Sequence, residues 1–267
     1  MHKYKVKFNH IIALSILVFA SGHAQNTTLY SNQIIRHPDG ILGRPNGQII
    51  GSYASVSAGR GIEVTDRQIL GIKMGLPAFK NLNLFGAYFG ERSGPFFHNL
   101  EIGCTIYPGN PIDSLKPCNP DGIPLSPAIS IAFIETIQDQ NADNSRQGYN
   151  LEVLLPISPH ITFGAGLKSF HKKPIYEAEK FSLLFKYYTA EYPPGQNYSN
   201  PDGVEGAATF SLKAGESGDG YFGQTELILP LEPLLTLIVY VKGEKISSPH
   251  IESKILGFRL KFYPGNQ

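Results

Sequence analysis

The stretch TELILPLEPLLTLIVYVKGE, residues 225–244, holds two strongly apolar runs separated by a four-residue break with two prolines. Proline cannot donate a hydrogen bond to a β-ladder and has a fixed φ angle, so it favours the end of a strand and a tight turn. The stretch therefore predicts a β-hairpin. Its outer face would meet either a soluble core or lipid, and the rest of the chain has to decide between these two environments.

The first 24 residues have the layout of a secretory signal peptide. Three lysines precede the apolar run IIALSILVFA (11–20), and small residues follow at Gly22 and Ala24. This arrangement predicts cleavage after Ala24 and export. Ten apolar residues are too few for a membrane-spanning helix, which needs about 20. We expect the mature chain to begin at Gln25.

Charge and cysteine content narrow the class of protein further. The chain has 267 residues and a formal charge of +1, which argues against a nucleic-acid partner because such a partner would require a basic excess. After the signal peptide no run of 18 apolar residues occurs, so a transmembrane helix is not expected. Cys104 and Cys118 are the two cysteines. They are a candidate disulfide in an oxidising compartment, and the alternative is two unpaired thiols.

Apolar and polar residues alternate in segments of about ten residues. Examples are LGIKMGL (70–76), ITFGAGLKSF (161–170) and ILGFRLKFY (255–263). Successive side chains of a strand point to opposite faces, so each segment has one apolar face and one polar or small face. Twelve strands are predicted, starting near Gly47, Arg67, Leu82, Asn99, Ala128, Gln147, Ile161, Lys180, Gly206, Tyr221, Leu234 and Glu252.

The connections between these segments alternate in length. Three of them are short and follow a Leu-Pro pair, whereas polar connections on the other side are longer, such as 138–148 and 242–253. Tight turns on one side and longer polar loops on the other are typical of transmembrane barrels. Two long connections, 108–127 and 189–205, fall on the short-turn side. Either the strands there are miscounted or these loops fold over the inner mouth.

Three features favour a membrane barrel over a soluble β-sandwich, the alternative fold. The segments are nine to eleven residues long, which suits tilted strands that cross a bilayer. Charges occur in mid-strand opposite the apolar face, and aromatic residues gather at strand ends. We predict an all-β fold: a closed antiparallel transmembrane β-barrel of about 12 strands, with 10–14 plausible. The predicted organisation is a signal peptide (1–24), an N-terminal plug or periplasmic arm (25–46) and the barrel (47–267).

On this pattern the chain resembles a bacterial outer-membrane β-barrel protein of the small porin kind. The resemblance rests on the exported start, the alternating strands, the Leu-Pro turns and the aromatic strand ends, and not on a defined family motif. It implies a location in the bacterial outer membrane, contact with its lipid bilayer, insertion by the outer-membrane assembly machinery, and passage of small solutes.

The alternation also assigns residues to the two faces of the barrel. The side chains predicted to face the lumen are Lys73, Glu101, Glu152, Lys168, Lys186, Lys213, Glu226, Lys242, Arg259 and Lys261. The side chains predicted to face lipid are Leu235, Leu237, Val239, Val241, Phe258, Leu260 and Phe262. A register error of one residue would reverse such an assignment.

Neither catalysis nor cofactor binding is predicted. A nucleophilic serine needs a base within hydrogen-bond reach, and the Ser-Pro-His sequences at 158–160 and 248–250 are better explained as turns. Metal-ligand spacings and nucleotide-binding motifs are also missing. The inward basic excess predicts a passive channel for small solutes with weak anion preference. The alternatives are a structural or surface-interaction barrel with a plugged lumen, and a secreted soluble β-sandwich that binds a ligand.

Overall fold

The computed structural model describes residues 36–41, 43–58, 66–92, 96–109, 127–138, 141–170, 179–191, 201–232, 234–247 and 250–263. The predicted signal peptide, residues 1–24, lies outside these ranges. No helix in them is long and apolar enough to cross a membrane.

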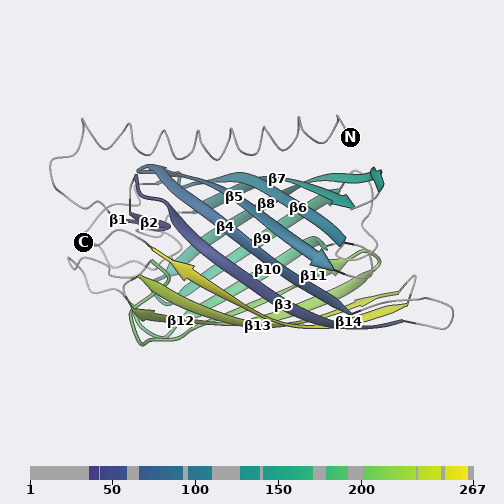
Figure 1. The fold of residues 1–267 in the computed structure, drawn as a ribbon. Coiled ribbons are helices and arrows are strands. Elements are labelled where there is room, and N and C mark those ends of the chain that lie inside the picture. Colours follow the sequence, from purple (N-terminus) through teal and green to yellow (C-terminus); the bar gives the residue numbers. More distant parts are fainter. Residues whose placement is uncertain are drawn as a thin grey trace.

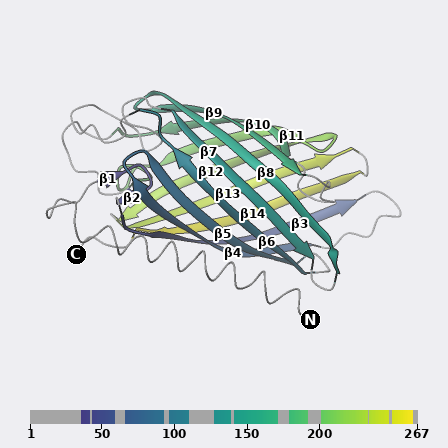
Figure 2. The same ribbon diagram turned by 90° about the horizontal axis from the view of Figure 1, so that it is seen from above.

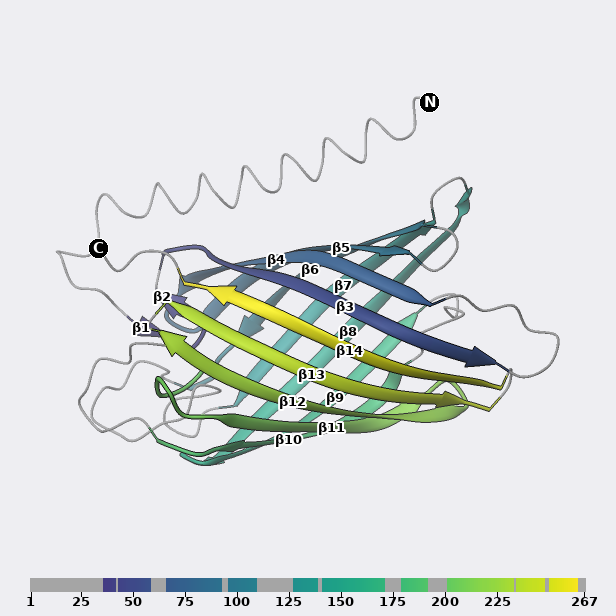
Figure 3. The same ribbon diagram turned by 60° about the horizontal axis from the view of Figure 1, so that its bottom comes forward.

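Twelve antiparallel strands form a closed barrel (Figure 1). Each strand pairs with its neighbour in sequence, and β14 pairs with β3 to close the ring, from Phe262 opposite Gly47 to Ile251 opposite Ala58 (Figure 3). The predicted fold class and strand number are therefore confirmed. The barrel strands are β3 (Asn46–Ala58), β4 (Arg67–Phe79), β5 (Leu82–Arg92), β6 (Phe96–Ile106), β7 (Ala128–Gln138), β8 (Asn141–Ser158), β9 (Ile161–Phe170), β10 (Glu179–Tyr188), β11 (Thr209–Ser217), β12 (Gly220–Glu232), β13 (Leu235–Ile246) and β14 (Ile251–Phe262).

The outer face of the barrel is apolar and exposed. Along β13, Val239 and Val241 are exposed by 37% and 56%, whereas Ile238 between the outward positions is exposed by only 2%. Aliphatic side chains that are more than half exposed include Leu70, Ile72, Leu183, Leu212 and Leu256. An apolar belt of this extent is not stable in water, and it suits the hydrocarbon of a bilayer. Closed pairing also leaves no unpaired sheet edge in lipid. The chain thus has the architecture of an outer-membrane β-barrel.

The three predicted Leu-Pro hairpins share one irregularity. The pairing register shifts directly after Pro77 in β4, after Pro156 in β8 and after Pro230 in β12. Proline has no N–H for the ladder, so the strand bulges there and the chain turns within a few residues. All three turns lie at one end of the barrel, called here the inner end, and the opposite end is called the outer end.

Two predicted loops at the outer end are wrong. Most of 138–148 belongs to strand β8, which pairs Asn141 with Gln138 at the tip of the hairpin. Most of 242–253 belongs to β13 and β14, which continue to Ile246 and from Ile251. Backbone pairing does not require apolar side chains, so a ladder can extend beyond the bilayer where the apolar alternation has ended.

A small hairpin, β1 (Arg36–His37) with β2 (Gly40–Ile41), lies at the inner end (Figures 1 and 2). The Tyr107 hydroxyl donates a 2.7 Å hydrogen bond to the Asp39 carboxylate, and the Gly43 N–H donates to the Pro77 carbonyl at 2.7 Å. His37 is 3% exposed, and burial lowers its pKa despite the nearby Asp39 carboxylate. The role of residues 25–46 as plug or arm stays a prediction, but the described hairpin is fixed to the barrel mouth.

Candidate functional site

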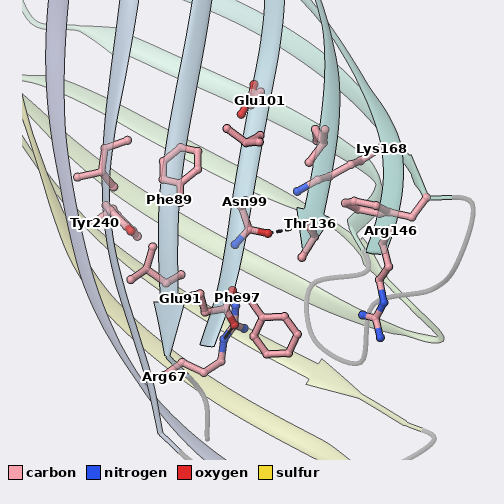
Figure 4. Close-up of a pocket in the computed structure, with 15 residues that line it drawn as sticks. Arg67, Phe89, Glu91, Phe97, Asn99, Glu101, Thr136, Arg146, Lys168 and Tyr240 are labelled. Atoms are coloured by element: carbon pink, nitrogen blue, oxygen red, sulfur yellow. Dashed lines mark hydrogen bonds and ion pairs between the residues drawn. The ribbon is translucent and has the colours of Figure 1, made fainter. Parts of the chain in front are cut away.

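Two cavities lie inside the barrel. The inner chamber, of about 320 Å³, is lined by residues that include Asp39 of the hairpin, Lys73, Glu152 and Lys261. The outer chamber, of about 290 Å³, is lined by residues that include Arg67, Asn99 and Lys168 (Figure 4). Glu101 lines both chambers. It therefore stands where the two chambers meet.

Eight of the ten residues predicted to face the lumen line these chambers. The inner chamber has Lys73, Glu101, Glu152, Lys186, Glu226, Arg259 and Lys261, and the outer chamber has Lys168 as well as Glu101. Lys213 and Lys242 line neither chamber, and their ammonium groups lie over the ring of Phe222, at 5.9 and 4.9 Å from its centroid.

The residues predicted to face lipid occupy alternate positions of β13 and β14. Phe258 and Phe262 are exposed by 47% and 38%, and each pairs across the ladder with an outward residue of β13, Val239 and Leu235. Leu237, Val241 and Leu260 belong to the same alternating set, with Leu237 opposite Leu260.

The wall of the inner chamber formed by β12 and β14 carries an ion pair. Arg259 donates to the Glu226 carboxylate, which also accepts a 2.6 Å hydrogen bond from the Gln224 amide. The Arg259 guanidinium in addition lies over the Tyr240 ring, 5.1 Å from its centroid. Four basic and five acidic side chains line this chamber in total. Its formal charge is therefore nearly balanced.

Asp202, in the connection between β10 and β11, reaches into the inner chamber. Its carboxylate accepts hydrogen bonds from the Lys261 ammonium at 2.6 Å and from the Tyr263 hydroxyl at 2.5 Å. Burial opposes ionisation of Asp202, but the charge of Lys261 and the hydrogen bonds outweigh it, so its pKa lies below the ordinary aspartate value. Of the two explanations for the long connection 189–205, its described part from residue 201 favours a loop that folds over the inner mouth.

The outer chamber combines aromatic walls with charged groups. Phe89, Phe97, Phe170 and Tyr240 line it, and Arg67 binds Glu91 at its rim with a 2.8 Å ion pair (Figure 4). The Asn99 amide oxygen accepts a 2.6 Å hydrogen bond from Thr136.

Three charged residues of this chamber are missing from the sequence-based set: Arg67, Glu91 and Arg146. Arg67 could have been found, because it lies six residues before Lys73 on the same strand and so shares its face. Arg146 lies in a segment that the sequence predicts as a loop, so no facing could be assigned to it.

Some charged side chains of the lumen have a polar or aromatic partner, and others have no ion pair. Glu101 and Glu152 form no ion pair with any residue that the structure describes, and the same is true of Arg146. Most basic groups, in contrast, lie against a carboxylate or an aromatic ring, such as Lys73 at 4.0 Å from the Phe85 ring centroid. The formal count of basic residues thus overstates the positive charge that is available to a solute.

The histidines among the described residues have structural partners. The His160 ring Nδ1 lies 2.8 Å from the Tyr188 carbonyl in a tight turn, and His98 lies 2.7 Å from the Tyr88 hydroxyl on the outer face. Among the described residues, no group of three or more His, Cys, Asp and Glu is arranged to hold a metal ion. Cys104 lies on the outward face of β6, between the inward Gly103 and Thr105. Cys118 is outside the described residues, and the disulfide stays a prediction.

No protein-family model and no curated protein sequence matches this chain. Among solved structures it is similar to the KdgM porin in complex with disordered oligogalacturonate, at 9% identity and TM-score 0.45, over 82% of this chain and 99% of that chain. It is also similar to outer membrane protein Omp33 of Acinetobacter baumannii, at 13% identity and TM-score 0.41, over 82% and 98% of the two chains. Outer membrane phospholipase A of Escherichia coli matches at 10% identity and TM-score 0.45, over 87% and 94%. At these values the similarity assigns neither a function nor a binding site.

Proposed function

We propose that this protein is a passive channel for small solutes in the bacterial outer membrane. The observation that carries the proposal is the pair of lumen chambers, which lie toward opposite ends of the barrel and share Glu101 in their linings. Polar and charged side chains line both chambers, as a water-filled path requires. The apolar exterior is the surface on which the outer-membrane assembly machinery and lipid would act.

The expected selectivity is weak. The outer chamber has three basic and two acidic side chains, which supports the weak anion preference predicted from the sequence. The nearly balanced inner chamber works against a strong preference of either sign. Chambers of about 300 Å³ would admit solutes of the size of a single sugar or amino acid and retard larger ones.

A plugged structural barrel is the second candidate. It is favoured by the two elements at the inner mouth, the β1–β2 hairpin fixed by Asp39 to Tyr107, and the connection fixed by Asp202 to Lys261. A barrel closed at this mouth would present only its outer-end turns to a partner.

Current across a planar bilayer distinguishes these candidates. The chain from Gln25 is refolded in detergent, its folding is checked by the shift in gel migration on boiling, and it is inserted under a salt gradient. Discrete current steps support the channel, and the sign of the reversal potential reports the ion preference. A folded sample that carries no current would refute the channel and favour the plugged barrel.

A further inference from the structure

The outer chamber has a carboxylate on β6 and an ammonium group on β9, with apolar side chains between them. We propose that it binds a small zwitterion with an apolar side group, of the class of an apolar α-amino acid. The proposal depends on the proposed function for one point only, that solutes enter the lumen. The site consists of Glu101, Lys168 and the apolar and aromatic side chains between them.

The strand register sets the separation of the two charges. Glu101 on β6 pairs with Ile134 on β7, Ile134 pairs with Gly148 on β8, and Gly148 pairs with Phe170 on β9. Lys168 lies two residues from Phe170, on the same face of β9. Neighbouring strands are about 4.8 Å apart, so the backbones of Glu101 and Phe170 are separated by roughly 14 Å across the wall, and Lys168 lies about 7 Å further along β9. The Phe170 ring lies over Gly148, where a Cβ would come 2.6 Å from the ring Cδ1, so Ile134 and Phe170 form the apolar surface between the two charges.

Both charges are available to a ligand. Glu101 has no ion-pair partner among the described residues, and the Lys168 ammonium lies over the Phe170 ring, 5.3 Å from its centroid. In Figure 4 the Lys168 ammonium points across the chamber toward the strand that carries Asn99 and Glu101. Arg67, in contrast, is bound to Glu91 at the rim, and the Arg146 guanidinium extends away from Lys168 toward the outer end of the barrel (Figure 4). The Glu101 carboxylate can accept hydrogen bonds from a ligand ammonium, and Lys168 can donate to a ligand carboxylate.

The remaining lining selects an apolar group. Phe89, Phe97, Leu100, Ile134 and Phe170 line the chamber. A cavity of about 290 Å³ lies just below the usual range for ligand sites, roughly 300–1,000 Å³, and so suits a single small molecule. A simple anion would be attracted by Lys168 but repelled by Glu101. A simple cation would be attracted by Glu101 but repelled by Lys168. A zwitterion satisfies both groups.

Three probes of similar size test the charges separately: phenylalanine, 3-phenylpropanoate, which lacks the ammonium group, and 2-phenylethylamine, which lacks the carboxylate. Their binding to the refolded chain in detergent is measured by ligand-observed NMR. We expect phenylalanine to bind at least about tenfold more tightly than either analogue, because each analogue loses one charge-assisted contact. Equal binding of the three probes, or no binding of phenylalanine, would overturn the proposal.

Variants assign the contacts to residues. Glu101→Gln should remove the preference for phenylalanine over 3-phenylpropanoate, and Lys168→Gln should reduce the preference over 2-phenylethylamine. Glu152→Gln is the matched control, because Glu152 lines only the inner chamber, and both preferences should stay. Unchanged preferences in Glu101→Gln would refute the site. Phenylalanine binding without bilayer current would refute the channel but support the binding site. Bilayer current without phenylalanine binding would support the channel but refute the binding site.

Discussion

Replacing Asp202 with Asn removes the carboxylate that ties residues 201–208 to the inner wall of β14. The side chain of Asp202 is 13% exposed and that of Lys261 is 28% exposed, so water screens their ion pair only in part. We call this connection the Asp202 latch. If the latch narrows the inner mouth, its release should increase the current through the barrel.

The structure sets the size of the effect. Removing one partner of a buried ion pair costs about 3–5 kcal/mol. Asparagine keeps an oxygen that can still accept from Tyr263, so we expect a value near the lower limit, about 3 kcal/mol. Every 1.4 kcal/mol is a factor of ten, which corresponds to a shift of roughly a hundredfold in the equilibrium between a docked and a released latch.

Acidification should release the same latch in the unaltered chain. The pKa of Asp202 is lower in the folded protein than in the unfolded chain. Its contribution is therefore complete above the unfolded aspartate pKa, about 4, and is lost as the pH falls through the lower folded value. Current should be constant near neutral pH and increase only in strongly acidic solution. Asp202→Asn should lack this acid-dependent step.

Single-channel recording at pH 7, with the temperature of gel-shift loss as a measure of stability, checks the prediction. Asp202→Asn should increase mean current and lower that temperature. Asp219→Asn makes the same chemical change in the exposed turn between β11 and β12 and should alter neither quantity. Unchanged current and unchanged stability in Asp202→Asn would refute the latch. A loss of stability with unchanged current would show that the latch does not narrow the path.

Two further predictions concern the barrel wall. Val239→Arg puts a charge on the exposed apolar face in the middle of β13 and should destabilise the barrel by about 2–4 kcal/mol in urea unfolding from lipid vesicles, whereas Ser57→Arg near the outer end of β3 should cost about 0–1 kcal/mol. Gly103→Ala would bring a Cβ to 2.3 Å from the Ile131 carbonyl oxygen and should cost about 1–3 kcal/mol in the same assay. Its control is Gly223→Ala, where a Cβ would meet nothing within 4 Å and the free energy of unfolding should not change. Equal effects of Val239→Arg and Ser57→Arg would contradict the assigned facing, and equal effects of the two glycine variants would contradict the assigned packing.

The strands of this barrel could be predicted from sequence because lipid imposes a simple pattern on them. Within the bilayer every second residue must be apolar, and the chain turns at Leu-Pro pairs, so the predicted starts at Arg67, Leu82 and Ile161 coincide with the observed ones. Beyond the bilayer that constraint ends. The polar segment 141–148 still pairs as strand, but its composition is that of a loop, and for that reason Arg146 could not be placed.

The electrostatics of the lumen depend on contacts that a count of charges does not contain. The sequence gives each inward charge equal weight, yet Arg259 is bound to Glu226, 33 residues away, and Lys261 is bound to Asp202, 59 residues away, in a segment that the strand pattern leaves out. Such pairs form only when the strands have paired side by side, because Glu226 and Arg259 lie on β12 and β14, on either side of β13. The groups that remain without an ion pair among the described residues are of both signs, with Glu101 and Glu152 acidic and Lys168 and Arg146 basic. A solute in the lumen therefore experiences a local field whose sign varies from one chamber to the next, and this variation favours molecules that carry both charges.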